Sequence, residues 1–485
     1  MKTLMVVDDA DEWNGVLKGV SIVSSADFLT KPLYVERSLK VFNLCRSYQY
    51  QTAGYYVSLL ASARGQKVVP TISTILDLKA KHFLKLQSVG LDKLIQRSLK
   101  NLQSEHFQLS IYFGKNVALR YEKLAYELHK HFSAPLLRAT FKRKDKWRLQ
   151  SIGPIGLSDV PPSHCEILGQ FADEYFKKRQ SSKKVKIPRF DLAILVNPQD
   201  PQPPSNERAL REFFKAADRL NIDVEFITKE DFHRLPEFDG LFIRETTAVN
   251  HHTFRFSHRA NALGLAVIDD PLSILRCANK VYLAELFERY KIPAPRTLLL
   301  HKKDFKNKLS SISLPAILKE PDSSFSRGVS KAESYEGLLS KLRLMFENSD
   351  IIIVQEFLPT DFDWRVGILD GKPLYVCKYY MAKNHWQIYR QGKSGAVEDG
   401  FVETFSLSQA PPAVVNIAVQ VCRPIGEGFY GVDIKEKDGK FFVIEVNDNP
   451  SIDAGCEDVV LKNVLYESIM KAMLQRMERI AMGVY

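Results

Sequence analysis

Residues 431–447 read GVDIKEKDGKFFVIEVN, and this stretch decides the fold that we expect for the C-terminal half of the chain. Apolar and polar residues alternate on both sides of Asp438-Gly439, a turn signal, so we predict a β-hairpin. The apolar residues of its two arms share one face only if the loop has an odd number of residues. We therefore predict a three-residue loop, Lys437-Asp438-Gly439, with Gly439 in the left-handed conformation. The apolar face would consist of Val432, Ile434, Phe442, Ile444 and Val446.

The opposite face of this hairpin would carry three side chains with oxygen atoms, Asp433, Glu445 and Asn447. Two carboxylates and an amide oxygen form a hard-oxygen donor set that suits Mg²⁺, which also binds the phosphates of a nucleotide. The alternative is the solvent-exposed polar face of an amphipathic hairpin. The sequence Asp448-Asn449-Pro450 after Asn447 is unusual for a solvated strand end and favours the metal site.

Residues 351–354 (IIIV) are a continuous apolar run that predicts a buried strand, and Gln355, Glu356, Phe357 and Leu358 follow it. A segment that leaves a buried strand presents backbone donors and acceptors beside apolar walls, which suits a flat base such as adenine. Taken alone, this pattern is only weak support for a nucleotide site.

A second hairpin is predicted from Asp363 to Tyr380, with the two-residue turn Asp370-Gly371. This turn would place Arg365 and Lys378 on one face, with Asp363 across from Lys378. Two cations on one face either neutralise phosphoryl oxygens or pair with nearby acids in a surface ladder. The sequence leaves both possibilities open.

Lys319 ends a short apolar strand and precedes a polar loop, residues 322–329, which contains Ser326 and the single glycine Gly328. A hydroxyl-rich loop with free backbone N–H groups can close over phosphates, with Lys319 as a point charge beside them. An ordinary connection between two strands is the alternative.

Taken in order, these motifs resemble the ATP-grasp superfamily, and most closely its RimK-like carboxylate–amine ligases. The resemblance covers the chain from Phe190 onward. Its strongest parts are residues 355–357 (QEF), residues 363–366 (DWRV), and the set Asp433, Glu445 and Asn447 followed by Pro450. The order and spacing of these motifs carry the resemblance more than any single one.

The resemblance implies roles for particular residues. The ATP-binding residues would be Lys280, Lys319, Ser326, Gln355, Glu356, Phe357, Leu358 and Asp363, and the metal ligands would be Asp433, Glu445 and Asn447. Arg365 would stabilise the phosphorylated intermediate, with Lys378 and Arg390 as further catalytic cations. Two features depart from the family: the phosphate loop keeps one glycine, and the arginine pattern expected near Arg390 is not recoverable.

The same resemblance implies ATP and Mg²⁺ as cofactors, with one or two ions and Mn²⁺ as a substitute. The reaction would form an amide through an acyl phosphate, with glutamate as the amine donor and a small molecule, peptide or protein tail as the carboxylate acceptor. One alternative is a kinase that phosphorylates a hydroxyl. Another is a non-catalytic nucleic-acid-binding or protein-binding factor that uses the basic clusters at residues 142–148 and 177–189. We rank this alternative below the enzyme.

The length of 485 residues predicts several domains, which we place at 1–182, 190–279 and 280–485. The first would be an α/β domain for acceptor recognition or assembly, the second a small parallel α/β domain, and the third the ATP-grasp domain with mixed and antiparallel sheets. The net charge of +11 favours anionic partners. We expect a cytoplasmic protein without a membrane segment, with a homo-oligomer as one possible state. The histidines His251, His252 and His258 are assigned structural or surface roles.

Overall fold

The computed structural model describes residues 2–13, 17, 19–36, 39–79, 91–177, 189–322, 328–383, 385–391 and 397–483. The chain divides into two compact units. The first comprises Met1–Asp191 and Glu230–Asp239, and the second comprises Leu192–Lys229 and Gly240–Tyr485. The division into three domains that we expected from the sequence stays a prediction.

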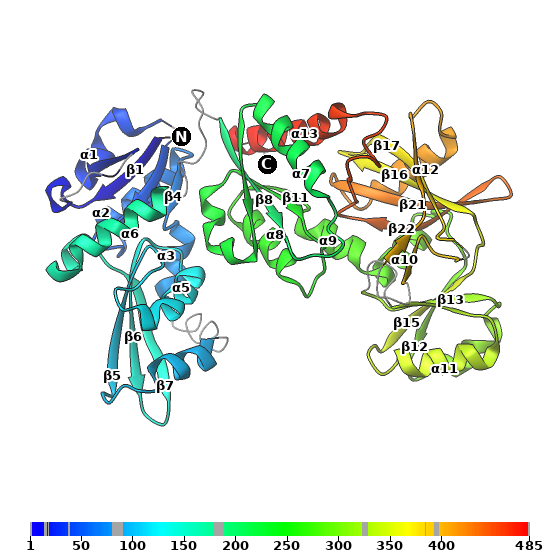
Figure 1. The fold of residues 1–485 in the computed structure, drawn as a ribbon, viewed down its shortest axis with the longest axis horizontal. Coiled ribbons are helices and arrows are strands. Elements are labelled where there is room, and N and C mark those ends of the chain that lie inside the picture. Colours follow the sequence, from blue (N-terminus) through cyan, green and yellow to red (C-terminus); the bar gives the residue numbers. More distant parts are fainter. Residues whose placement is uncertain are drawn as a thin grey trace. The chain divides into compact units, whose positions relative to one another are not determined.

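The first unit contains a parallel sheet and an antiparallel sheet (Figure 1). The parallel sheet has the order β2-β1-β3-β4, with β1 (Lys2–Val7), β2 (Val20–Ser24), β3 (Leu39–Asn43) and β4 (Lys67–Val69). The antiparallel sheet has the order β5-β6-β7, with β5 (His106–Tyr112), β6 (Leu136–Arg143) and β7 (Trp147–Pro154). The helices include α1 (Ser25–Thr30), α2 (Ala53–Ala63), α3 (Ile72–Lys79), α5 (Glu122–His131) and α6 (Cys165–Lys177). The predicted α/β character of this region is therefore confirmed.

The second unit begins with a small sheet whose order is β11-β10-β8-β9. Its strands are β8 (Phe190–Val196), β9 (Ile222–Ile227), β10 (Gly240–Arg244) and β11 (Ala266–Ile268), and β10 runs parallel to β8 and β11. The helices are α7 (Glu207–Arg219), α8 (His252–Ala262) and α9 (Pro271–Ala278). The side chain of Asn206 caps α7 by accepting a hydrogen bond from the Ala209 N–H.

Two antiparallel sheets follow in the same unit. The four-stranded sheet, in the order β12-β15-β13-β14, contains β12 (Thr297–His301), β13 (Ala316–Lys319), β14 (Val329–Ala332) and β15 (Ile351–Glu356). The five-stranded sheet, in the order β20-β17-β16-β21-β22, contains β16 (Phe362–Leu369), β17 (Lys372–Tyr380), β20 (Val402–Phe405), β21 (Phe429–Lys437) and β22 (Lys440–Asn447). A small pair, β18 (Tyr389–Gln391) with β19 (Val397–Asp399), completes the strands.

Helices cover one face of each antiparallel sheet. The four-stranded sheet shares a buried core with α11 (Tyr335–Met345), and the five-stranded sheet shares one with α10 (Lys280–Arg289) and α12 (Pro412–Cys422). The last helix, α13 (Asn463–Ala481), packs against α7 and β11. Because strand residues alternate between faces, each sheet has a second face opposite its core.

The hairpin β21–β22 differs from the predicted geometry in its turn. Lys437 pairs with Lys440, so the loop has two residues, Asp438 and Gly439, with φ of 51° and 69°. These two left-handed residues form the tight turn that best matches strand twist, and the predicted three-residue loop is wrong. A β-bulge at Ile444 supplies the extra residue instead, because Asp433 pairs with Glu445 whereas Ile434 pairs with Val443.

The bulge changes which apolar residues of this hairpin enter the core. Val432, Ile434, Val443 and Val446 are all buried within the cluster beneath the sheet. Phe442 and Ile444, which we expected on that face, are only partly buried, and Val443 takes their place. The predicted grouping of Asp433, Glu445 and Asn447 is nevertheless retained, because the bulge lies on the turn side of Glu445.

The second hairpin, β16–β17, has the predicted two-residue turn at Asp370-Gly371, since Leu369 pairs with Lys372. A register shift near Gly367 then moves the partners by one residue: Arg365 pairs with Cys377, and Lys378 pairs with Trp364. Lys378 therefore lies on the face opposite Arg365, and the prediction that these two cations share a face is wrong.

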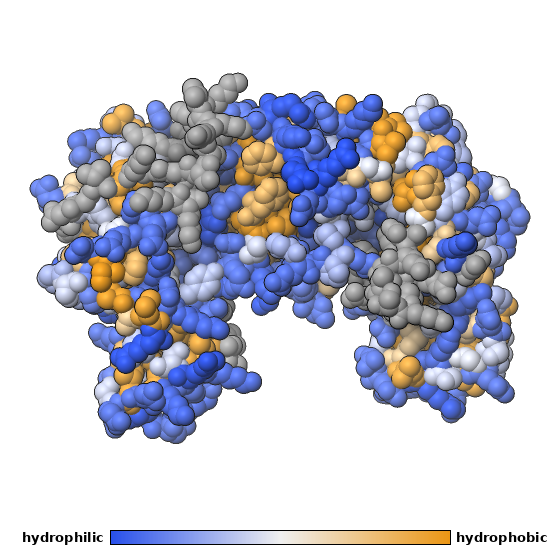
Figure 2. Space-filling model, in the orientation of Figure 1, coloured by the Kyte–Doolittle hydropathy of each residue, from blue (hydrophilic) through white to orange (hydrophobic). Residues whose placement is uncertain are grey.

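The space-filling view shows hydrophilic residues over most of the visible face, with apolar residues in small groups (Figure 2). Among the helices described here, not one has the length and apolar character to cross a membrane. No disulfide joins any of the six cysteines, all of which lie among the described residues.

Candidate active site

A cavity of about 290 Å³ lies between the two antiparallel sheets of the second unit, on the faces that the helices do not cover. The four-stranded sheet contributes Ile317 and Lys319 from β13 together with Gln355 from β15. The five-stranded sheet contributes Arg365, Asp433 and Glu445, among others. The loop at 246–250 and the turn at 448–451 close another side.

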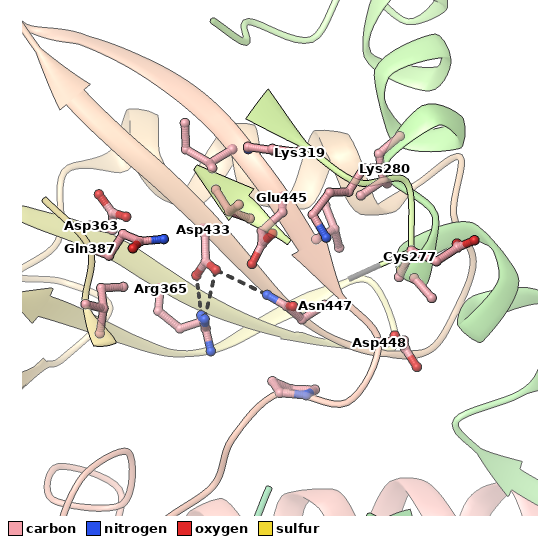
Figure 3. Close-up of a pocket in the computed structure, with 18 of the residues that line it drawn as sticks. Cys277, Lys280, Lys319, Asp363, Arg365, Gln387, Asp433, Glu445, Asn447 and Asp448 are labelled. Atoms are coloured by element: carbon pink, nitrogen blue, oxygen red, sulfur yellow. Dashed lines mark hydrogen bonds and ion pairs between the residues drawn. The ribbon is translucent and has the colours of Figure 1, made fainter. Parts of the chain in front are cut away.

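The three predicted metal ligands meet on the cavity side of β21 and β22 (Figure 3). Asp433 and Glu445 are direct partners in the ladder, where paired side chains lie side by side. The Asn447 amide lies 3.2 Å from Oδ2 of Asp433 and 3.4 Å from the carbonyl of Gly431. Two carboxylates and an amide therefore converge on one part of the cavity, as the sequence predicted.

The electrostatics of these carboxylates suit a cation. Burial raises the pKa of Asp433 to about 6, although Arg365 opposes the rise. Burial acts on Glu445 in the same direction, but Lys280, Lys319 and Arg365 outweigh it and hold its pKa below the usual range. Both groups are thus ionised at neutral pH for the most part, as ligands of a divalent cation must be.

Two ion pairs fix the charged side chains of the cavity in place. The Arg365 guanidinium donates to both carboxylate oxygens of Asp433, with 2.8 Å between Nη2 and Oδ2. Lys435 donates to Oδ1 of Asp363 at 2.6 Å, and the Thr360 hydroxyl donates to the same oxygen at 3.2 Å. Arg365 therefore orients Asp433, one of the predicted metal ligands, whereas Asp363 is held by a lysine that the sequence did not single out.

Two further lysines line the cavity beside Glu445. Lys319 ends β13 and is buried, and Lys280 begins α10, whose first turn is capped by the side chain of Asn279. Asn279 also donates to Asp322 at 2.8 Å, and the Lys280 N–H donates to the carbonyl of Pro321. The start of the helix and the start of the polar loop are thereby tied together, and a helix N-terminus favours phosphate.

The Lys319 ammonium predicts that nucleotide binding is coupled to the binding of a proton. Burial lowers the pKa of Lys319 to about 8, whereas bound phosphate would raise it again. We therefore expect the affinity for ATP to fall as the pH rises through about 8. At a pH of about 9, ATP binding should be accompanied by the uptake of a proton. Titration calorimetry in two buffers of different ionisation enthalpy measures this uptake.

The Lys319→Met variant is the control for this expectation, because it removes the titrating ammonium, and Lys319→Arg keeps a permanent charge. Both variants should lose the proton uptake, while only Lys319→Met should bind ATP much more weakly. Equal uptake in the wild type and in Lys319→Met would contradict the assignment.

Apolar side chains provide walls for a flat ring in the same cavity. Ile317 and Val329 come from the four-stranded sheet, and Ile444 comes from the bulge of β22. The end of β15 and the segment after it line the cavity with Glu356, Phe357 and Leu358. Phe357 carries Lys331 Nζ over its ring at 4.1 Å and meets Trp386 edge to face.

Gln355 is buried and donates through Nε2 to the Thr297 hydroxyl at 3.0 Å. This contact holds the end of β15 against β12. The side chain of Glu356 is exposed at the rim of the cavity. The predicted base-binding segment therefore borders the cavity with both backbone and side chains, and its neighbours 386–388 also line it.

One predicted residue, Lys378, stands apart from this cavity, and the structure does not place the side chains of two others. The Lys378 ammonium lies over the rings of Phe362 and Trp364, at 4.1 Å and 4.7 Å, on the core side of the sheet. Ser326 falls outside the described residues. Arg390 belongs to β18, and its side chain is not described.

Replacement of Lys378 by methionine separates the two faces of the sheet. Because Lys378 contacts aromatic rings rather than the cavity, we expect Lys378→Met to keep turnover within about threefold of the wild type. Loss of the cation–π contacts should lower the free energy of unfolding by about 1 kcal/mol. Steady-state ADP release and chemical denaturation measure both quantities, and Arg365→Met, on the other face, should abolish most turnover.

Several cavity residues were missed by the sequence reasoning. Lys435 follows Asp433 by two positions, and strand alternation could have placed it on the same face. The loop 246–250 has no motif that marks it. Asp448 is buried on the cavity side with one carboxylate oxygen, Oδ2, lacking a hydrogen-bond partner, and burial raises its pKa to about 7. Its position directly after Asn447 was the available signal.

The donor set at Asp433, Glu445 and Asn447 fits Mg²⁺, because it offers hard oxygens and leaves the cavity side open for phosphates and water. Asn447 fits with its amide oxygen turned toward the cavity, since the two amide positions are interchangeable by rotation. Four cationic side chains on the cavity wall, Lys280, Lys319, Arg365 and Lys435, complement the charge of a polyphosphate.

Comparison with known proteins assigns most of the chain to two domain families. Residues 25–170 match the RimK-like ATPgrasp N-terminal domain, and residues 277–464 match the RimK-like ATP-grasp domain. These matches confirm the resemblance drawn from the motifs, and they extend it to residues 25–170, which precede the part of the chain that carries those motifs.

The individual proteins that the chain resembles have low sequence identity to it. The chain is 27% identical over 251 residues to "Alpha-aminoadipate–LysW ligase LysX" of Saccharolobus solfataricus, covering 48% of this chain and 85% of the relative. It is 24% identical over 226 residues to "Probable alpha-L-glutamate ligase" of Maridesulfovibrio salexigens, covering 45% and 71%. Among solved structures, D-alanine–D-alanine ligase from Bacillus anthracis aligns with a TM-score of 0.48 and 15% identity over 61% of this chain and 99% of that chain.

Proposed function

Because the chain belongs to the RimK-like ATP-grasp family of carboxylate–amine ligases, we propose that it uses ATP and Mg²⁺ to join a carboxylate to an amine through an acyl phosphate. One observation carries the proposal: Asp433, Glu445 and Asn447 meet in a cavity whose walls also hold four cationic side chains. Oxygen ligands for a cation beside cations for phosphates are the combination that phosphoryl transfer requires.

In the proposed complex, the adenine lies between Ile317 and Ile444, with its edge against the backbone after β15. The triphosphate extends toward Lys319 and Lys280, whose charges lie beside Glu445. Asp433, Glu445 and Asn447 would hold Mg²⁺, which when bound neutralises phosphate oxygens and fixes their geometry. Lys435 keeps Asp363 in place near the nucleotide.

The reaction proceeds in two steps. An oxygen of the acceptor carboxylate attacks the γ-phosphorus, the bond to the β-phosphate oxygen breaks, and ADP leaves. The amine nitrogen then attacks the acyl carbon, inorganic phosphate leaves with the carbon–oxygen bonding pair, and the nitrogen loses a proton. Positioning and charge neutralisation by Lys280, Lys319 and Arg365 lower the barrier of the first step, so no protein nucleophile is needed.

We propose glutamate or a related amino acid as the amine donor. Support comes from relatives named alpha-L-glutamate ligase and from the family to which the chain belongs. The acceptor is proposed as an anionic small molecule, peptide or protein tail, because the net charge of +11 favours anionic partners.

Incubation of the purified protein with ATP, Mg²⁺, glutamate and a panel of acidic small molecules and peptides tests this proposal. We expect ADP release that depends on both the acceptor and the amine, and a product whose mass equals acceptor plus glutamate minus water. A stable phosphoester would instead identify a kinase. Salt-sensitive RNA binding without ADP release on any acceptor would favour a non-catalytic role.

A further inference from the structure

A second group of possible metal ligands lies in the second unit, between the end of β10 and the start of α8. Glu245, His251 and His252 each offer a ligand atom, and these atoms lie within 4.8 Å of one another. Glu245 is 2% exposed, and Nε2 of His252 lies 2.9 Å from its carboxylate. The rings of His251 and His252 are in contact, with 3.9 Å between their centroids. None of these three residues lines the cavity between the sheets.

The spacing of the three groups matches a small coordination sphere. Zinc bonds of about 2.0–2.1 Å in tetrahedral geometry place neighbouring ligand atoms about 3.3 Å apart. The observed separations run from 2.9 Å, between Glu245 and His252, to at most 4.8 Å. The three groups therefore already lie near the spacing of one coordination sphere, with both imidazoles half-buried.

The hydrogen bond of His251 prepares its ring for this role. Nδ1 of His251 lies 3.1 Å from the Thr253 hydroxyl, which itself donates to the carbonyl of Thr246 at 3.5 Å. When Nδ1 carries the proton, Nε2 keeps its lone pair. Imidazoles that bind metals commonly have their second nitrogen fixed in this way.

We propose that Glu245, His251 and His252 bind one divalent transition-metal ion of the zinc class, at a site separate from the oxygen site at Asp433. Two imidazoles and one carboxylate select zinc, cobalt or nickel over magnesium, because nitrogen donors favour these ions. Three protein ligands leave a fourth position for water or for another ligand.

Such an ion would fasten the loop that forms one wall of the catalytic cavity. Residues 246–250 line that cavity and are bracketed in sequence by Glu245 and His251. The backbone carbonyl of Glu245 also accepts a hydrogen bond from Asn449, two residues after the ligand Asn447. An ion bound at both ends of the loop would restrict its movement relative to the turn at 448–451.

Titration of the full-length protein with Zn²⁺ alone tests this inference without any ligase assay. We expect one equivalent to bind in the Asp433→Asn variant as in the wild type, because the two sites are separate. His251→Ala should weaken that binding at least about tenfold and His252→Ala more strongly, while His258→Ala, an exposed histidine on the same helix, should bind like the wild type.

Thermal unfolding provides the second readout, because an ion that binds only the folded state raises the melting temperature. Zn²⁺ should raise it in the wild type and in His258→Ala but not in His251→Ala, a variant that leaves the contact between Glu245 and His252 intact. Absence of the Zn²⁺ equivalent from the wild type, or its retention in both His251→Ala and His252→Ala, would overturn the proposal. Neither result would bear on the proposed ligase reaction.

Discussion

Asp433→Asn is expected to reduce turnover by about three orders of magnitude while the protein stays folded. The change removes a charged oxygen from the proposed metal site, and it removes the charge that holds Arg365 in place. Loss of about 4 kcal/mol of transition-state stabilisation corresponds to this factor. Steady-state ADP release with saturating ATP measures the effect, and circular dichroism verifies the fold.

The matched control lies in the same hairpin. Asp438 occupies the two-residue turn with φ of 51°, and asparagine tolerates this left-handed conformation well. Asp438→Asn therefore makes the same chemical change far from the cavity and should keep wild-type turnover. If Asp433→Asn retained a tenth or more of the activity, the metal assignment would have to be given up.

Lys435→Met is expected to lower the free energy of unfolding by about 3 kcal/mol, the largest loss of stability that we predict. The substitution leaves the Asp363 carboxylate buried, with the Thr360 hydroxyl but without its cation. Removing one partner of a buried ion pair typically costs about 3–5 kcal/mol, and partial relief through protonation places this variant at the lower end. Urea denaturation followed by tryptophan fluorescence measures the loss.

The pH dependence of this variant has a definite sign. Burial already raises the pKa of Asp363 in the wild type despite Lys435, and removal of the lysine should raise it further. A carboxyl group with a raised pKa binds its proton more tightly in the folded state, so the destabilisation should be small at acid pH and grow as the pH rises through that pKa.

The double variant Lys435→Met/Asp363→Asn separates charge burial from packing. With both charges removed, the protein should regain more than half of the lost stability. A double variant as unstable as Lys435→Met would show that the lysine stabilises the fold through its methylene groups and not through the ion pair.

The sequence predicted the hairpins and their polar faces because these depend on local alternation and on turn residues. Asp433, Glu445 and Asn447 were grouped correctly, although the predicted loop was wrong. The two-residue turn and the bulge at Ile444 each shift the register by one residue, and two such shifts return Glu445 to the face of Asp433. Between the turn and the bulge only one shift applies, and there Val443 replaces Ile444 in the core.

The misplacement of Lys378 has the same physical cause. A bulge depends on the packing of the whole sheet rather than on a local signal, and the register shift near Gly367 moves Lys378 to the core side. A Cβ atom at Gly367 would lie 2.1 Å from the Tyr375 ring, so this ring occupies the space that a side chain would need. Such a tertiary contact is not visible in a single sequence. By contrast, Lys435 could have been predicted as a cavity residue, because it follows Asp433 by two positions on the same strand.

The bulge at Ile444 also determines where this part of the gene can change length. Loss of the codon for residue 444 would leave a continuous ladder from the turn to Asn447, with every cation ligand in its present place and only an apolar wall removed. Loss of a residue between 445 and 447 would instead displace a ligand. A chain without residue 444 would therefore have a cavity of altered shape, with Asp433, Glu445 and Asn447 undisturbed beside it.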